Sequence, residues 1–420
     1  MIRQIDGGNT GFDGHNRREF LKKTSAGIAG AGLVMGALSS RRVLGANERI
    51  RMGVIGVGDR GSWGMREAIR HGAEIVAVCD VYQTRLENAI AVAGDQQQGN
   101  KPRGYKEFRK VLDRADIDAV FIGTPDHWHH DMLIAAVQAG KDAYVEKPFS
   151  KTIEQGKAMV RAVRATDRIV QVGNHRRSGE HWARAAELIK SGRLGRVVWV
   201  HVQDLRDWSR GDPWAAWINR FTPAERAKLD WDMFLGPAPK RRFDVHRYFT
   251  WRWFWDYAGG LLTDIGAHQI DVAQWLLDTL GPKKVVANGG NYFFDTWETP
   301  DVVHLTADYG TACVTFSVEF VSNRMSHIEA VVHGSDASLV VGGGEFQLLP
   351  RGSKEPVETW KRPYEGPAHM ANFLDCIRTR KQPNSPVEVG HRVITTAHLG
   401  NLSYREKRVI EWDAEKEQFI

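Results

Sequence analysis

The chain has 420 residues, 42% hydrophobic and 26% charged, a composition typical of soluble globular proteins and long enough for two or three domains. Its formal net charge of +6 is concentrated in residues 1–46, which hold seven Lys or Arg residues and three acidic ones. The remainder carries only about +2, which argues against a nucleic-acid-binding face.

The first 46 residues form a candidate targeting segment. Arg17 and Arg18 precede Phe-Leu-Lys, and a weakly apolar, Gly- and Ala-rich run follows from Thr24 to Leu38. This order resembles a twin-arginine export signal, and the run is shorter than the roughly 20 residues that a membrane-spanning helix needs. We therefore predict cleavage near Ala46 and a periplasmic or extracytoplasmic protein without a membrane anchor.

Residues 50–80 show the pattern strand, glycine turn, helix, strand. Gly56, Gly58 and Gly61 form a G-x-G-x-x-G motif directly after an apolar run. Glycines let the backbone approach a pyrophosphate, and the N-terminus of the following helix supplies unpaired N–H groups. In this context the motif predicts a dinucleotide-binding Rossmann unit.

Asp80 ends that unit, after the apolar stretch "EIVAVC". A carboxylate at this place accepts hydrogen bonds from the adenosine ribose and repels a 2′-phosphate, which favours NAD over NADP. Arg60 and Arg85 oppose that preference, so NADP remains possible.

Two further buried strands are expected at 119–122 and 143–145. Thr124 and Pro125 follow the first, and Lys147 follows the second. These residues are expected at the carboxyl edge of a parallel sheet, where active groups gather.

No metal site is predicted. The Asp- and His-rich stretch 126–131 suggests one, but successive histidines in a loop diverge and match no ligand spacing. Three widely spaced cysteines also indicate neither a zinc site nor a disulfide scaffold.

Residues 182–255 contain nine of the fifteen tryptophans. Trp251, Trp253 and Trp255 would share one face if that segment were extended. Aromatic faces stack on sugar rings, although packing in a core or a subunit interface is the commoner role of any single tryptophan. The density of tryptophans favours a carbohydrate site.

The stretch "GGLLTDIGAHQIDVAQW" places Asp264, His268 and Asp271 at offsets of four and three, on one face of a predicted helix. Such a row can ligate a metal, carry out acid–base chemistry or solvate an exposed face. The apolar residues around it predict a partly buried helix, and buried ionisable groups need a reason. Asp271 is expected to be structural.

Further strands are expected within 283–360, and two helices around a Pro-rich loop are expected after residue 366. The predicted organisation is a signal peptide (1–46), a dinucleotide-binding Rossmann domain (47–173), an α/β substrate and oligomerisation domain (174–365) and C-terminal helices packing back towards the first domain (366–420).

Three motifs in order, the glycine loop, "EKP" at 146–148 and "GGLLTDIGAHQID" at 259–271, make residues 50–405 similar to the Gfo/Idh/MocA oxidoreductases. The resemblance implies an α/β fold: a Rossmann domain followed by an α/β domain with an open, mostly antiparallel sheet. That sheet often forms subunit interfaces, so a homo-oligomer is expected.

The resemblance also implies a catalytic site of Lys147, Asp264 and His268. Histidine suits proton removal from a hydroxyl group near pH 7, so His268 is the expected base. Asp264 would orient the substrate or the imidazole, and Lys147 would stabilise alkoxide charge. A cis bond before Pro148 is common in the family. The expected cofactor contacts are Gly56, Gly58, Gly61, Asp80, Thr124, Pro125, His129, Glu146 and Lys147.

The leading hypothesis is an exported NAD(P)-dependent oxidoreductase acting on a sugar, polyol or related hydroxyl compound. An NAD-dependent glycosidase that works by transient oxidation and elimination is an alternative, and a non-catalytic binding protein of the same fold is a third. Since nicotinamide cofactors are made in the cytoplasm, an exported enzyme is expected to hold its cofactor tightly and to run a redox-neutral cycle.

Overall fold

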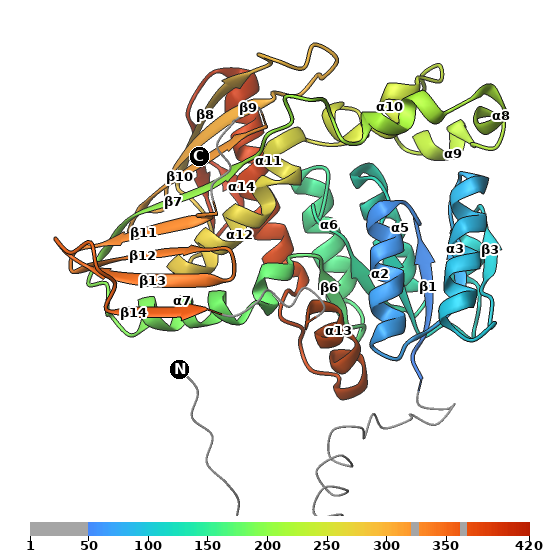
Figure 1. Cartoon of the computed structure of the whole chain (residues 1–420), viewed down its shortest axis with the longest axis horizontal. Coiled ribbons are helices and arrows are strands. Elements are labelled where there is room, and N and C mark those ends of the chain that lie inside the picture. Colours follow the sequence, from blue (N-terminus) through green and yellow to red (C-terminus); the bar gives the residue numbers. More distant parts are fainter. Residues whose placement is uncertain (1–48, 321–326, 362–367) are drawn as a thin grey trace, which may run out of the picture. The chain divides into compact units, whose positions relative to one another are not determined.

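A computed structural model describes residues 49–320, 327–361 and 368–420, so the predicted export signal lies outside the described residues. Residues 50–420 form one compact unit. That unit contains a parallel sheet and a second, mixed sheet, each packed against helices (Figure 1). The predicted α/β fold class is confirmed.

The first sheet has six parallel strands in the order β3-β2-β1-β4-β5-β6. Both of its faces are buried: in β4, Val120 and Ile122 join one hydrophobic cluster, whereas Ala119 and Phe121 join another. Burial on two faces explains why these strands are continuous apolar runs. The strands are β1 (Arg51–Ile55), β2 (Glu74–Cys79), β3 (Arg103–Tyr105), β4 (Ala119–Ile122), β5 (Asp142–Val145) and β6 (Val170–Val172). The helices between them are α2 (Asp59–Arg70), α3 (Gln83–Gln96), α4 (Arg109–Leu112), α5 (His129–Gln138) and α6 (Ile153–Arg164).

The strand order reverses between β1 and β4, which are neighbours in the sheet. Gly56 follows β1, Asp80 follows β2, Thr124 lies just beyond β4 and Lys147 just beyond β5. The sheet therefore brings the four predicted site residues to one edge, at the switch point where open α/β sheets bind ligands.

The second sheet has ten strands in the order β14-β13-β12-β11-β7-β10-β9-β8-β15-β16. Only the pair β7 and β10 is parallel, so the sheet is mostly antiparallel, as expected. The strands are β7 (Val197–Leu205), β8 (Lys284–Gly290), β9 (Val302–Asp308), β10 (Cys313–Glu319), β11 (Ala330–Gly334), β12 (Ala337–Gly342), β13 (Glu345–Pro350), β14 (Glu358–Lys361), β15 (Ile410–Asp413) and β16 (Gln418–Phe419).

One face of this sheet is buried and the other is open. In β9, Val303, Leu305 and Ala307 are buried, while the residues between them are exposed. The buried face packs against helices α7 (Glu180–Lys190), α12 (Gly266–Leu277) and α14 (Val387–Glu406). On the open face, Trp199 stacks on His333 with ring centroids 4.6 Å apart.

Residues 206–259, here named the cover segment, leave the second domain, and their middle part packs on the first domain. They contain the short helices α8 (Pro223–Arg226), α9 (Trp231–Leu235) and α10 (Val245–Phe249). In Figure 1 these helices lie above α3 and α5. The contact is a hydrophobic cluster in which Tyr82 of the first domain meets Leu229, Phe234 and Tyr248. The cover segment therefore lies over the edge of the parallel sheet that carries the glycine loop.

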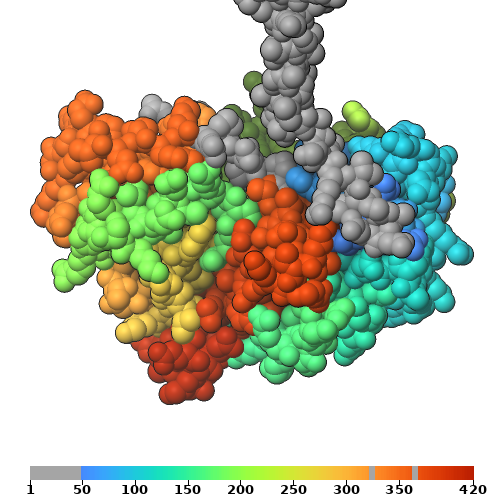
Figure 2. All heavy atoms as spheres, turned by 90° about the horizontal axis from the view of Figure 1, so that it is seen from below, coloured from blue at the N-terminus to red at the C-terminus, as the bar shows by residue number. Residues whose placement is uncertain are grey.

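The C-terminal helices contact both domains. Helix α13 (Ala368–Thr379) contributes Met370, Phe373 and Leu374 to the core of the first domain, and Figure 2 shows this orange-red part of the chain between the two domains. Helix α14 packs on α6 and on β8. Strands β15 and β16 then extend the second sheet, an ending that the sequence did not predict. None of the helices in the described parts of the chain is long and apolar enough to cross a membrane.

Candidate active site

The glycine motif forms the turn between β1 and α2. Gly56 has a φ of +80°, which favours glycine. A Cβ atom at Gly61 would lie 1.7 Å from the carbonyl oxygen of Gly56, so helix and turn approach too closely for any other residue. The glycine turn therefore has the tight backbone that lets a dinucleotide pyrophosphate approach it closely.

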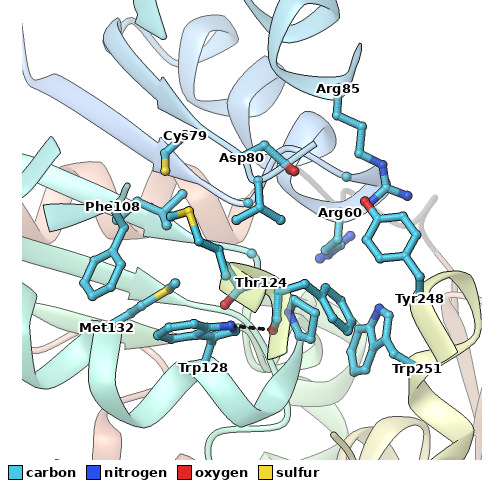
Figure 3. Close-up of a pocket in the computed structure, with 18 of the residues that line it drawn as sticks. Arg60, Cys79, Asp80, Arg85, Phe108, Thr124, Trp128, Met132, Tyr248 and Trp251 are labelled. Atoms are coloured by element: carbon cyan, nitrogen blue, oxygen red, sulfur yellow. Dashed lines mark hydrogen bonds between the residues drawn. The ribbon is translucent and has the colours of Figure 1, made fainter. Parts of the chain in front are cut away.

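A cavity lies between this turn and the cover segment; we call it the glycine-loop cavity. Its empty volume is about 1020 Å³, part of it open to solvent. The first domain lines it with Gly56, Gly58, Asp80, Thr124 and Pro125. Figure 3 shows Tyr248 and Trp251 of the cover segment across the cavity from Asp80. Five of the nine predicted cofactor residues thus share one cavity with the cover segment, whereas Gly61, His129, Glu146 and Lys147 do not line it.

Asp80 braces the glycine loop. Its Oδ2 atom accepts a hydrogen bond from the backbone N–H of Val57 at 2.9 Å, and Oδ1 accepts one from Tyr82 at 2.9 Å. Burial raises the pKa of this carboxyl group, and the nearby Arg85 counteracts the rise. The guanidinium of Arg85 lies over Gly58, with Nη1 3.2 Å from the position of a Cβ there. A carboxylate and a cation therefore flank the same part of the cavity.

Glu146 is buried and paired with Arg60. Arg60 Nε donates a hydrogen bond to Glu146 Oε1 at 2.8 Å, and the same guanidinium lies 3.9 Å from the ring centroid of Trp63. His175 also contacts Arg60. This group ties α2 to the loop after β5, so Glu146 holds the loop that carries Lys147.

Lys147 and Asp264 form an ion pair between the two domains. Lys147 Nζ donates hydrogen bonds to Asp264 Oδ1 at 2.8 Å and to the Asp264 carbonyl oxygen at 2.7 Å. Burial by itself would raise the pKa of Asp264, but Lys147 and then Arg252 hold it below its usual value. The peptide bond between Lys147 and Pro148 is cis, as the resemblance implied. The structure thus brings together two residues 117 positions apart.

His268 lies in the next helix, not in the same one as Asp264. Helix α11 (Gly260–Asp264) ends before Ile265, and α12 starts at Gly266, so the prediction of one continuous helical face was wrong. Burial lowers the pKa of His268 well below 6.5, and Lys147 and Arg176 lower it further. Its ring centroid is 5.7 Å from that of His175. The imidazole is therefore neutral near pH 7.

His129 is fully buried behind the loops. Its Nδ1 atom lies 2.7 Å from the carbonyl oxygen of Pro148, and its Nε2 atom lies 3.0 Å from that of Thr124. Burial lowers its pKa to about 4. His129 does not line the glycine-loop cavity. Its position indicates that it links the loops after β4 and β5, whereas Thr124 and Pro125 face the cavity.

Asp271 pairs with Arg177, whose Nε donates to Asp271 Oδ1 at 2.7 Å. This contact joins α12 to the segment after β6, in agreement with the structural role expected from the sequence. No group of three or more His, Cys, Asp or Glu residues within the described ranges is arranged to hold a metal ion.

The sequence did not single out Arg252, and it drew attention to Asp126 only as part of the stretch 126–131, where no metal site is predicted. Arg252 lines the glycine-loop cavity and lies 3.6 Å from Asp264 Oδ1. Asp126 is 1% exposed, and within the described parts of the chain neither of its carboxyl oxygens has a hydrogen-bond partner. Burial raises its pKa well above the usual value, and the charge of Asp264 adds to the rise. No spacing pattern links these residues to the motifs, so only folding reveals them.

The tryptophan-rich segment does not form a single aromatic face. Residues 251–253 are a short 3-10 helix, so Trp251, Trp253 and Trp255 do not share one extended face. Trp253 is completely buried and stacks on Trp297 at 3.9 Å. Trp251 lines the cavity together with Trp214. Most of these rings therefore serve packing, and only a few face a site.

Two family models match the chain. The oxidoreductase family with an NAD-binding Rossmann fold matches residues 50–174, and its C-terminal alpha/beta domain matches residues 181–420. The chain belongs to the Gfo/Idh/MocA family. It therefore has an NAD-binding oxidoreductase fold, as the resemblance of its motifs implied.

The curated relatives include dehydrogenases and glycosyl hydrolases. The chain is 26% identical to scyllo-inositol 2-dehydrogenase (NAD(+)) of Bacillus subtilis (strain 168) over 357 residues, covering 80% of this chain and 88% of that protein. It is 31% identical to glycosyl hydrolase family 109 protein 2 of Shewanella sp. (strain ANA-3) over 206 residues, 44% of this chain and 45% of the relative. The match to that hydrolase thus spans less than half of its length.

Solved structures share the fold. Levoglucosan dehydrogenase in complex with NADH and levoglucosan is 19% identical with a TM-score of 0.68, covering 86% of this chain and 99% of that chain. Aldose-aldose oxidoreductase from Caulobacter crescentus, complexed with glycerol, is 20% identical with a TM-score of 0.67, covering 86% and 99%. At these identities the likeness concerns the fold alone.

Proposed function

We propose that this chain is an exported NAD-dependent oxidoreductase that oxidises a secondary hydroxyl group of a sugar, polyol or related compound. The Lys147–Asp264 pair beside neutral His268, at the edge that carries the glycine loop, supports this function most strongly. Asp80 favours NAD, although Arg85 leaves room for NADP. The names of the inositol and levoglucosan dehydrogenases point to hydroxyl substrates of the same kind.

In this proposal each side chain has one task. Bound NAD supplies the acceptor for the hydride that leaves the carbinol carbon. His268 is neutral, so its imidazole accepts the hydroxyl proton, and Lys147 stabilises the negative charge that develops on oxygen. Asp264 orients Lys147 and the substrate hydroxyl. Thr124, Pro125 and Glu146 shape the cofactor side of the site.

The same proposal includes a cofactor that stays bound. The cover segment supports slow dissociation, because Tyr248, Trp251 and Phe249 close the cavity opposite the glycine loop. Retention after export requires a dissociation constant well below micromolar, which corresponds to a binding free energy more negative than about −8 kcal/mol. NAD should therefore be released when protein from the periplasmic fraction is denatured, and mass spectrometry should find it. Largely empty sites, with activity only on addition of NAD, would contradict retention and export.

A redox-neutral cycle follows from retention, and two forms of it are open. A second substrate can take the hydride back, as the name aldose-aldose oxidoreductase suggests for that fold relative. Alternatively, the hydride returns to the same sugar after elimination of an aglycone, a glycosidase reaction that the family 109 relative favours.

Incubation of the NAD-loaded protein with aryl glycosides and with free sugars separates these possibilities. Net nicotinamide reduction by free sugars supports the oxidoreductase, and aglycone release without net reduction supports the glycosidase. If neither signal appears, a binding protein of the same fold is the remaining candidate. Absorbance in the reduced-nicotinamide band and release of the aryl group are read from the same sample.

The open face of the second sheet supports a homo-oligomer. Trp199 and Val286 are 40% and 44% exposed, and Trp199 stacks on His333. A second copy of the sheet would cover these groups. Light scattering should give the mass of a dimer or larger species, and Trp199→Glu should shift it towards the monomer.

A further inference from the structure

Arg252 is held between two tryptophan rings. Its guanidinium carbon lies 4.1 Å from the ring centroid of Trp214 and 4.3 Å from that of Trp251. All three residues line the glycine-loop cavity, and the Arg252 side chain is 18% exposed. Stacking on both sides fixes the guanidinium without using its N–H groups, which therefore stay available for another partner.

Among the residues that the structure describes, no carboxylate accepts a hydrogen bond from Arg252. Its closest acidic partner is Asp264 Oδ1 at 3.6 Å, and that oxygen already accepts a hydrogen bond from Lys147 at 2.8 Å. The Nε atom of Arg252 is buried without a hydrogen-bond partner among the described residues. Two cations thus share one carboxylate, and burying an incompletely paired guanidinium is costly.

The other charged groups near the site do not remove this imbalance. Burial raises the pKa of the Asp126 carboxyl group well above its usual value, which favours the neutral form of this group over a full negative charge beside Arg252. Three further arginines have carboxylates of their own: Arg60 pairs with Glu146, Arg176 with Glu329 and Arg206 with Asp204. Arg85 also lines the cavity, but it lies near Asp80 at the glycine loop. Arg252 is the cavity-lining cation that lies next to the Lys147–Asp264 pair, and it is therefore best placed to receive a negative charge from a ligand there.

We propose that Arg252, clamped between Trp214 and Trp251, binds a carboxylate of the substrate, so that the preferred substrates are acidic sugars such as hexuronic acids. This inference rests on the proposed function. A guanidinium matches a carboxylate through two parallel hydrogen bonds, which fixes orientation as well as charge.

A bound carboxylate would also improve the site for proton removal. In the free protein, Lys147, Arg176, Arg60 and Arg206 add to burial in lowering the pKa of His268. An anion at Arg252 offsets part of that positive potential and makes the imidazole a stronger base. Recognition of an acidic sugar and proton removal from its hydroxyl group would then be coupled.

The test compares matched sugars with and without the carboxylate: D-glucuronate against D-glucose, and D-galacturonate against D-galactose. The initial rate of nicotinamide reduction in the NAD-loaded protein, measured at limiting sugar concentrations, gives the second-order rate constant of the first half-reaction for each sugar, which is used here as kcat/KM. Tryptophan fluorescence gives the affinities for the sugars. In Arg252→Gln, the acid-to-neutral ratio of kcat/KM should fall about 10- to 100-fold, as expected for loss of a charge-assisted hydrogen-bond pair. The affinity for the acids should fall with it.

Arg247→Gln is the matched control. Arg247 also stacks on an aromatic ring, Phe254 at 4.4 Å, but it already pairs with Asp256 and Glu298. It does not line the cavity, so its replacement should leave the acid-to-neutral ratio unchanged.

Several outcomes would overturn the inference. Wild-type preference for the neutral sugars contradicts it but leaves the oxidoreductase proposal standing. If Arg252→Gln loses NAD, measured by mass spectrometry, with no change in the ratio, then Arg252 binds the cofactor. An equal loss with acidic and neutral sugars means that it only positions Asp264. No reduction by any of the four sugars contradicts the inference and counts against the proposed function as well.

Discussion

Breaking the ion pair between Lys147 and Asp264 tests how much this contact between the two domains contributes to the stability of the protein. Their side chains are 14% and 6% exposed and their charged atoms are 2.8 Å apart. Losing one partner of a buried pair costs roughly 3–5 kcal/mol. Lys147→Met leaves Asp264 with Arg252 at 3.6 Å, so we expect the lower end of that range. Asp264→Asn leaves two cations without their carboxylate, so we expect the upper end.

The effects of the two substitutions on the free energy of unfolding should not be additive. In the double variant neither charge of the pair remains, so its free energy of unfolding should exceed the additive expectation by about 2 kcal/mol. Urea unfolding followed by circular dichroism measures all four proteins, with NAD content matched because bound ligand stabilises the folded state. If the losses of unfolding free energy in the two single variants sum to the loss in the double variant within about 0.5 kcal/mol, the two charges do not stabilise each other.

Three variants and one pH profile probe the rest of the site and the cover segment. His268→Gln should lower turnover by ~10²–10⁴ without loss of bound NAD; near-normal rates would remove His268 as the base. In the unmodified protein, kcat/KM should decline only below pH 6.5, because burial and the charge of Lys147 hold the pKa of His268 well below that value and the base is lost only on protonation; a decline already at higher pH would identify another base. Gly58→Val should abolish NAD binding in a calorimetric titration while circular dichroism stays unchanged, because the side chain would occupy the space of the pyrophosphate. Gly236→Ala should loosen the cover segment, because Gly236 has a φ of +49° and a Cβ atom there would lie 2.0 Å from Trp128; unchanged proteolysis within residues 206–259 would contradict the packing.

The sequence predicted the parts of the site that short-range patterns encode. Gly56 and Gly61 are fixed by a turn that only glycine fits, and Asp80 and Lys147 follow apolar strands whose ends must meet at one edge of a parallel sheet. The family motif added Asp264. The positions of these residues in the site follow from local spacing and from the order of the strands, both of which can be read from the sequence.

Other features depend on packing between distant segments. Arg252 meets Trp214 and Asp264 because the two ends of the cover segment and α11 come together in the folded chain, which no local spacing displays. The interruption at Ile265 separates Asp264 from His268 in a stretch whose helical spacing looked continuous. His129 lay in a motif, but its two contacts with backbone carbonyl oxygens become visible only when the loops after β4 and β5 lie side by side.

A single-turnover experiment tests most directly whether resident NAD oxidises a sugar at the Lys147–Asp264–His268 site. The purified protein is freed of unbound nucleotide, its NAD content is quantified, and acidic and neutral sugars are added while the reduced-nicotinamide absorbance is followed. We predict a rise that matches the bound NAD in the unmodified protein and no rise in His268→Gln with the same NAD content. An equal rise in both proteins, or no rise with any sugar although NAD is bound, would contradict the proposed function.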